Sequence, residues 1–172
     1  MAPWPFRVGQ TYNRRKDIHD LYGGQQQQGI VTPARYPLII CITGSDGRAS
    51  GYEDEWLMDG SIDYYGEGAV GDMAFTHGNQ AIAEHVSSGE DILLFSKVQR
   101  DGTLRFEGQF VCAGHRIVDA PDIHGQLRKA IVFRLAPLDA EVRLYESVAD
   151  EISPEEMSLS ELRERAIAAG AD

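Results

Sequence analysis

The residues best suited to chemistry in this sequence lie between positions 49 and 68. Tyrosines, carboxylates and glycines follow one another there in two short segments, residues 49–56 and 60–68. This mixture suits a slot for a flat polar ring, because tyrosines stack on its faces and a carboxylate accepts a hydrogen bond from an exocyclic amine. Cytosine carries such an amine at N4. The alternative is that Tyr52 and Tyr64 belong to the core and that the acids form a solvated loop.

The motifs of common catalytic centres are absent from the sequence. We find no Gly-x-Ser-x-Gly elbow, no phosphate-binding Gly-x-x-x-x-Gly-Lys, no His-Glu-x-x-His and no Cys-x-x-Cys. The 5 histidines show no metal-binding spacing. The alternative is a metal or nuclease centre formed by His115 or His124 together with Asp119 or Asp122. We therefore expect a binding module rather than an enzyme, with no metal and no cofactor.

Short apolar segments separated by glycine-rich turns surround these residues. The candidate strands cover residues 36–43, 62–65, 92–99, 103–113 and 129–135. Asp101 and Gly102 predict a hairpin between the third and fourth of these strands. One helix is predicted over residues 78–86, with Asn79 as its cap and Ile82 and Val86 on one face. The pattern predicts an α+β fold with a strand-rich core, a barrel or a curled sheet.

The overall composition is that of a globular protein. The chain has 172 residues, of which 42% are hydrophobic and 25% charged. Apolar runs such as residues 38–42 are far shorter than the roughly 20 residues of a membrane span, and the N-terminus lacks a secretory signal pattern. We therefore expect no membrane partner and a cytoplasmic location. Cys41 and Cys112 lie in apolar segments, which favours reduced core thiols over a disulfide or a metal pair.

The charge is distributed unevenly along the chain. Its net value of -11 argues against a nucleic-acid ligand, because proteins that bind DNA are usually basic. Residues 1–135 carry 13 basic and 17 acidic side chains, net -4, whereas residues 136–172 carry 3 and 10, net -7. Helix signals near residues 158–170 predict a helix in that tail. We therefore expect a domain over residues 1–135 and an acidic helical extension over residues 136–172, with a linker to a further domain as the alternative.

A series of short motifs follows in order over roughly residues 9–135. They are Gly9-x-x-Tyr12-x-Arg14-Arg15-x-Asp17-Ile18-His19, Tyr22-Gly23-Gly24-Gln25, Gly29-Ile30, Gly51-Tyr52-Glu53-Asp54, Tyr64-Tyr65-Gly66-Glu67-Gly68, Gly71-Asp72-Met73 and Arg105-Phe106-Glu107-Gly108. This series resembles the SRA (SET- and RING-associated, or YDG) domain, in particular the bacterial form in modification-dependent HNH restriction endonucleases. The resemblance implies a PUA-like curled β-barrel with flanking helices, which recognises 5-methylcytosine by flipping the base out of the DNA duplex.

The resemblance also implies roles for the aromatic and acidic residues. Tyr52 and Tyr64 match the two residues that stack on the flipped base. The carboxylate that reads the Watson–Crick edge falls at Glu55 by spacing, with Asp54 as the alternative. If Glu55 is the reader, it replaces the more usual aspartate with a side chain that is one methylene longer.

The walls of the implied pocket come from small residues and from one replacement. The backbone of Ala49, Ser50 and Gly51 matches the segment that closes on the pyrimidine edge and leaves room for the methyl group. Tyr65 stands where eukaryotic relatives have threonine. Residues 106–108 replace Tyr-Asp-Gly, and we expect this change to affect barrel packing rather than base contact.

Two loops of the family would complete the interface. The glutamine loop lies where the family inserts a finger through the minor groove, and its members are Gln25, Gln26, Gln27 and Gln28. A solvated turn is the alternative. The long major-groove finger of eukaryotic relatives is missing, because only residues 69–77 separate Gly68 from the predicted helix. We therefore expect weak discrimination between hemimethylated and fully methylated sites.

Phosphate contacts need cations, and the chain offers few. The candidates are Arg14, Arg15, Lys16, Arg35, Arg48 and Arg116. Alternatively, Arg14 and Arg15 pair with Asp17 or Asp20. Because few counterions would be released, we expect a shallow dependence of affinity on salt.

The sequence thus predicts a domain that binds double-stranded DNA containing 5-methylcytosine or another 5-modified cytosine. One alternative is the targeting fragment of an HNH restriction endonuclease whose nuclease domain lies beyond Asp172. Another is a small acid–base enzyme that acts on a nucleoside or sugar. The preferred modification, the flanking sequence and the oligomeric state are left open by the sequence.

Overall fold

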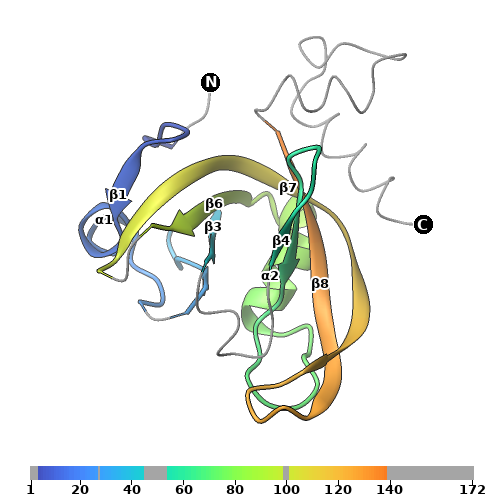
Figure 1. Ribbon diagram of the computed structural model, residues 1–172. Coiled ribbons are helices and arrows are strands. Elements are labelled where there is room, and N and C mark those ends of the chain that lie inside the picture. The colour runs from blue at the N-terminus through green and yellow to red at the C-terminus, as the bar shows by residue number, and fades with distance from the viewer. Residues whose placement is uncertain (1–3, 27, 45–53, 99–100, 139–172) are drawn as a thin grey trace, which may run out of the picture.

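A single curved sheet dominates the computed structural model, which describes residues 4–26, 28–44, 54–98 and 101–138 (Figure 1). Its strands are β1 (Thr11–Asn13), β2 (Ile30–Val31), β3 (Leu38–Thr43), β4 (Glu55–Trp56), β5 (Ile62–Tyr65), β6 (Asp91–Lys97), β7 (Thr103–Pro121) and β8 (Leu127–Pro137). The helical segments are the π-helix η1 (Arg14–His19), the short α1 (Asp20–Tyr22) and α2 (His77–Ser88). The predicted α+β class is therefore confirmed.

The eight strands form an open sheet rather than a closed barrel. Their order is β2-β3-β6-β7-β8-β5-β4, and β1 pairs with β7 beside this path. β3 and β6 run parallel, whereas the other paired strands are antiparallel. Within the described residues no pairing joins β4 to β2, and each of these end strands has 2 residues. Of the two predicted forms, a barrel or a curled sheet, the described residues therefore form the curled sheet, and the implied curled β-barrel is not closed, because such short end strands offer few groups with which to close it.

The strand β3 is buried on both faces, which explains its continuous apolar run. All 6 of its residues are buried. Ile39 and Cys41 pack in a first core with Ile82 of α2, whereas Leu38 and Ile40 pack in a second core with Phe6. Successive strand residues point to opposite faces, so an uninterrupted apolar sequence is what a strand between two cores requires.

Two bulges bend the long strand β7. Its pairing with β6 shifts between Gly108 and Phe106, which pair with Leu94 and Phe95. Its pairing with β8 shifts between Cys112 and Gly114. An extra residue at a bulge bends its strand and increases the local twist. The strand therefore arches over the sheet, as Figure 1 shows in yellow, and continues to Pro121, well beyond the predicted end at position 113.

The remaining predicted elements are confirmed, but the predicted cap of α2 was wrong. β3, β5, β6 and β8 lie where strands were expected, and α2 covers the predicted helix. Its N-cap is Thr76, without a side-chain hydrogen bond, while the Asn79 side chain instead accepts from Glu67 N at 2.7 Å and donates to Glu67 O at 2.9 Å. The Glu67 carboxylate in turn accepts from Gly78 N at 3.0 Å. This exchange pins the turn after β5 to the start of α2.

Two further expectations concern cysteines and membranes. Cys41 and Cys112 are free and buried, and burial raises the pKa of the Cys112 thiol to about 11. No helix in the described part of the chain is long and apolar enough to cross a membrane. The predicted acidic helix of the tail lies outside the described residues.

Candidate nucleic-acid interface

A carboxylate, that of Asp54, lies where three segments of the sheet meet. Asp54 directly precedes β4, and its Oδ2 accepts a hydrogen bond from Thr43 Oγ1 at the end of β3, at 2.8 Å. Its Oδ1 accepts from the backbone N of Tyr65, at the end of β5, also at 2.8 Å. Burial raises the pKa of Asp54 to about 6, although these two hydrogen bonds oppose the rise. An ionised carboxylate can accept further hydrogen bonds, so Asp54 can still bind a donor.

Glu55, the other candidate reader, faces away from Asp54. It is exposed on β4 and pairs in register with Asp63 of β5. Successive side chains on a strand alternate between faces, and the Glu55 charge acts on Arg116 of β7, whose pKa is raised mainly by its hydrogen bond to Asp63. The fold therefore separates the two neighbouring acids.

The two tyrosines of β5 occupy different environments. Tyr64 is only 3% exposed and packs in the first core. Its hydroxyl lies 3.1 Å from both the Gly29 and the Ile42 carbonyl oxygens, to which it donates. Tyr65 is partly buried against the same core. The backbone of Tyr65 thus holds the Asp54 carboxylate, whereas the Tyr64 ring lies in the first core. Tyr52 lies outside the described residues, as do Ala49, Ser50, Gly51 and Arg48.

The glutamine loop divides into a fixed and an exposed part. Gln25 Nε2 donates to Thr32 Oγ1, and Gln25 Oε1 accepts from Thr32 N, both at 2.8 Å. Gln26 and Gln28 are exposed, and Gln27 lies outside the described residues. Only part of the loop that the sequence singled out therefore presents side chains to solvent.

The candidate phosphate ligands also fall into two groups. Arg15, Lys16 and Arg35 are exposed and form no ion pair within the described part of the chain. Arg14 is partly buried and bonds to carbonyl groups of the glutamine loop. Among the described residues neither Arg14 nor Arg15 forms the alternative ion pair with Asp17 or Asp20. Asp17 Oδ2 instead accepts from Asn13 N at 2.7 Å.

A comparison with protein families shows to which family the chain belongs. The model of the ScoMcrA-like SRA domain matches residues 8–156. The chain belongs to this family. No curated protein matches it.

Solved structures agree with this SRA assignment. The sulfur binding domain and SRA domain of ScoMcrA, complexed with phosphorothioated DNA, matches with a TM-score of 0.60 and 29% identity over 76% of this chain and 39% of that one. The type IV phosphorothioation-dependent restriction endonuclease ScoMcrA matches with the same TM-score and identity, and this chain covers 28% of it. The SUVH5 SRA domain with hemimethylated CG DNA matches at a TM-score of 0.57 and 16% identity, over 81% and 93% of the two chains, and shows the shared fold.

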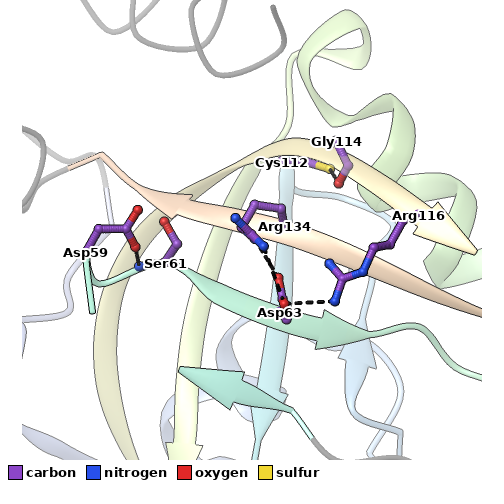
Figure 2. A network of polar contacts seen from close by, with 7 residues as sticks. All are labelled: Asp59, Ser61, Asp63, Cys112, Gly114, Arg116 and Arg134. Atoms are coloured by element: carbon purple, nitrogen blue, oxygen red, sulfur yellow. Dashed lines mark hydrogen bonds and ion pairs between the residues drawn. The ribbon is translucent and has the colours of Figure 1, made fainter. Parts of the chain in front are cut away.

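A second polar cluster of this SRA domain lies on the opposite face of β5 from Tyr64. Asp63, which the sequence reasoning missed, accepts from Arg116 Nη2 at 3.0 Å and from Arg134 Nε at 2.5 Å (Figure 2). Burial alone would raise the pKa of Asp63, but the two arginines together lower it below its ordinary value. Arg116, which was expected to contact a phosphate, is thus one of two arginines that form ion pairs with the buried Asp63 carboxylate. A charged residue inside the otherwise buried sequence of β5 was the available signal.

Replacing Asp63 with alanine is expected to lower the free energy of unfolding by about 1–3 kcal/mol. The change leaves Arg116 and Arg134 side by side without their carboxylate, and their 50% and 43% side-chain exposure limits the cost. Because the pKa of Asp63 is lowered on folding, its stabilisation is complete above the ordinary value of 3.8 and is lost as the pH falls further.

Urea denaturation at pH 7 measures this loss. The matched control is Asp119→Ala, which removes an ion pair to Lys129 whose side chains are 61–62% exposed, and a change of less than about 0.5 kcal/mol is expected there. Equal effects of the two substitutions would show that the ion pairs of Asp63 contribute no more than a surface pair.

Thr43 is the other residue that sequence reasoning missed. It ends the apolar run of β3, and its hydroxyl was the available signal because every other residue of that strand is apolar.

Phe106, from the motif that replaces Tyr-Asp-Gly, is buried in the second core. Among the described residues no group of three or more His, Cys, Asp or Glu side chains could hold a metal ion.

Proposed function

We propose that this chain is a binding module for duplex DNA that contains a modified cytosine, with 5-methylcytosine as the first candidate. The observation that carries this proposal is the Asp54 carboxylate, held by Thr43 and Tyr65 with lone pairs to spare. A carboxylate in that setting suits the N4 amine of a cytosine turned out of the duplex. The family supports the same ligand class, because SUVH5 SRA structures contain methylated and hydroxymethylated CG DNA.

In this proposal Asp54, rather than Glu55, reads the base edge. Tyr52 and Tyr64 flank the base, and residues 49–51 close on its pyrimidine edge. Stacking is worth about 1–3 kcal/mol per base, which can offset the few kcal/mol that flipping costs. The exposed Arg15, together with its neighbour Lys16, would contact phosphates.

A panel of otherwise identical duplexes tests the function. The panel carries cytosine, 5-methylcytosine, 5-hydroxymethylcytosine or a phosphorothioate at one position, and binding is measured by fluorescence anisotropy at two salt concentrations. We expect the methylated duplex to bind about tenfold more tightly than the unmodified one, the effect of one additional methyl group in a fitted pocket. Equal affinity for every duplex would exclude modified-base recognition.

A fluorescent base analogue beside the methylated site tests flipping separately. Unstacking its neighbour should brighten the analogue on binding. Binding without a change in fluorescence would retain the DNA-binding function and remove the flipping step.

We also propose that this module is part of a longer restriction endonuclease and directs it to modified DNA. The support is the match to ScoMcrA, of which this chain covers 28%. Extending the natural reading frame and assaying its product for cleavage of methylated duplexes tests this proposal. A reading frame that encodes no nuclease domain would exclude it.

A further inference from the structure

The Arg14 guanidinium bonds to both ends of the glutamine loop. Its Nη2 donates to the carbonyl oxygen of Gln28 at 2.6 Å and to that of Gln25 at 3.2 Å. Its Nε donates to His19 Nε2 at 2.9 Å. The N–H groups on Nε and Nη2 therefore donate to acceptors of the protein itself, and burial lowers the pKa of Arg14. This geometry differs from that of a surface arginine awaiting a phosphate.

The π-helix η1 brings Arg14 and His19 together. A π-helix bonds residues five positions apart, and Arg14 and His19 are its first and last residues. Because His19 Nε2 accepts from Arg14, the ring proton lies on Nδ1, which donates to Gly23 O at 2.9 Å. The buried His19 ring thus holds the guanidinium in place.

Two further contacts hold the same loop. The Gln25 side chain makes its paired hydrogen bonds to Thr32. The Gly29 carbonyl, at the far end of the loop, accepts from the Tyr64 hydroxyl and from Ile42 N, the latter at 2.8 Å. With both ends fixed, Gln26 and Gln28 remain exposed between them.

We propose that Arg14 and Gln25 are positioning residues, which hold the glutamine loop in its DNA-inserting shape before DNA arrives and do not contact DNA themselves. This role rests on the proposed DNA binding. A loop that is already ordered loses less conformational entropy on insertion, so preorganisation raises affinity without adding a contact. Arg14 and Gln25 are thereby removed from the residues that would touch DNA, and the exposed Gln26 and Gln28 remain as the inserting part.

Charge-preserving substitution separates positioning from phosphate contact. Arg14→Lys keeps the charge but cannot form the directed set of hydrogen bonds, whereas Arg14→Gln loses both. We expect both variants to bind the methylated duplex about tenfold more weakly with an unchanged salt dependence. The matched variant Arg15→Gln should instead reduce the slope of log K against log salt by about 0.9. An Arg14→Lys protein that binds like the wild type, with a reduced slope only in Arg14→Gln, would assign Arg14 to a phosphate.

A measurement without DNA tests the bracing itself. Amide ¹⁵N relaxation of residues 25–29 should show greater mobility in Arg14→Lys and in Gln25→Met than in the wild type or Arg15→Gln. Gln25→Met leaves η1 intact, so it supplies the test if Arg14→Lys fails to fold. Unchanged relaxation in a folded variant would overturn the proposal. Increased mobility in a protein that binds no modified duplex would keep the bracing role and contradict the proposed function.

Discussion

Asp54→Asn is expected to weaken binding of a methylated duplex by roughly 10- to 150-fold, because a hydrogen bond to a charged group is worth about 1.5–3 kcal/mol. Asparagine can keep both internal contacts, with its oxygen accepting from Tyr65 N and its amide donating to Thr43 Oγ1. The amide then faces the N4 amine of cytosine with a donor where an acceptor is needed. Fluorescence anisotropy at pH 7.5 measures the loss.

The same substitution should stabilise the folded protein at neutral pH. Burial raises the pKa of Asp54 from 3.8 to about 6, so the folded state binds this proton more tightly than the unfolded chain. Stability therefore falls as the pH rises from about 4 to about 6, and above that range the ionised carboxylate costs about 1–3 kcal/mol. Asparagine removes this cost, so its advantage in urea denaturation should be largest at pH 7.5 and should shrink toward pH 4.

Glu55→Gln is the matched control, because it neutralises the adjacent acid on the opposite face of β4. We expect it to change affinity by less than about twofold, as is usual for a surface charge that makes no contact with the ligand. The reverse result, a loss of binding in Glu55→Gln and none in Asp54→Asn, would identify Glu55 as the base reader.

Tyr52→Ala is expected to weaken binding by about 5- to 150-fold, which corresponds to the loss of one stacking contact. Binding is measured on methylated and unmodified duplexes, since only the flipped-base contact should be lost. A Tyr52→Ala protein that still prefers the methylated duplex to the full extent would remove Tyr52 from the pocket.

The partner tyrosine requires a different substitution. Tyr64 is buried in the first core, and an aromatic-to-alanine change there costs about 3–5 kcal/mol of stability, which would obscure any effect on binding. Tyr64→Phe keeps the ring and removes only the hydroxyl that bonds to Gly29 and Ile42. We expect Tyr64→Phe to bind the methylated duplex more tightly than Tyr52→Ala does.

Much of this fold could be predicted from local sequence patterns. The apolar run that became β3, the segment of β5 and the helix α2 each have a period or composition that a few adjacent residues suffice to establish. The ordered series of motifs pointed to the SRA family in the same way, because the order of residues along the chain is retained whatever their contacts.

Contacts between distant residues could not be predicted in this way. Asp54 and Glu55 are adjacent in sequence, yet one step along a strand reverses the face to which a side chain points, so the pairing of β4 with β5 decides which acid is sheltered. Similarly, Arg14 and Arg15 are equally good candidates for phosphate contacts in the sequence. The π-helical turn η1 directs Arg14 toward the loop carbonyls.

The sequence by itself determined the family, the positions of the main strands and the set of residues from which an interface can be built. The tertiary structure alone decided which of them share a face: Asp54 with Thr43 and Tyr65, Arg116 with Asp63, and Arg14 with Gln25 and Gln28. The physical reason is that element formation depends on near neighbours, whereas a polar side chain takes its role from the hydrogen-bond partners that strand register and helix geometry bring to it.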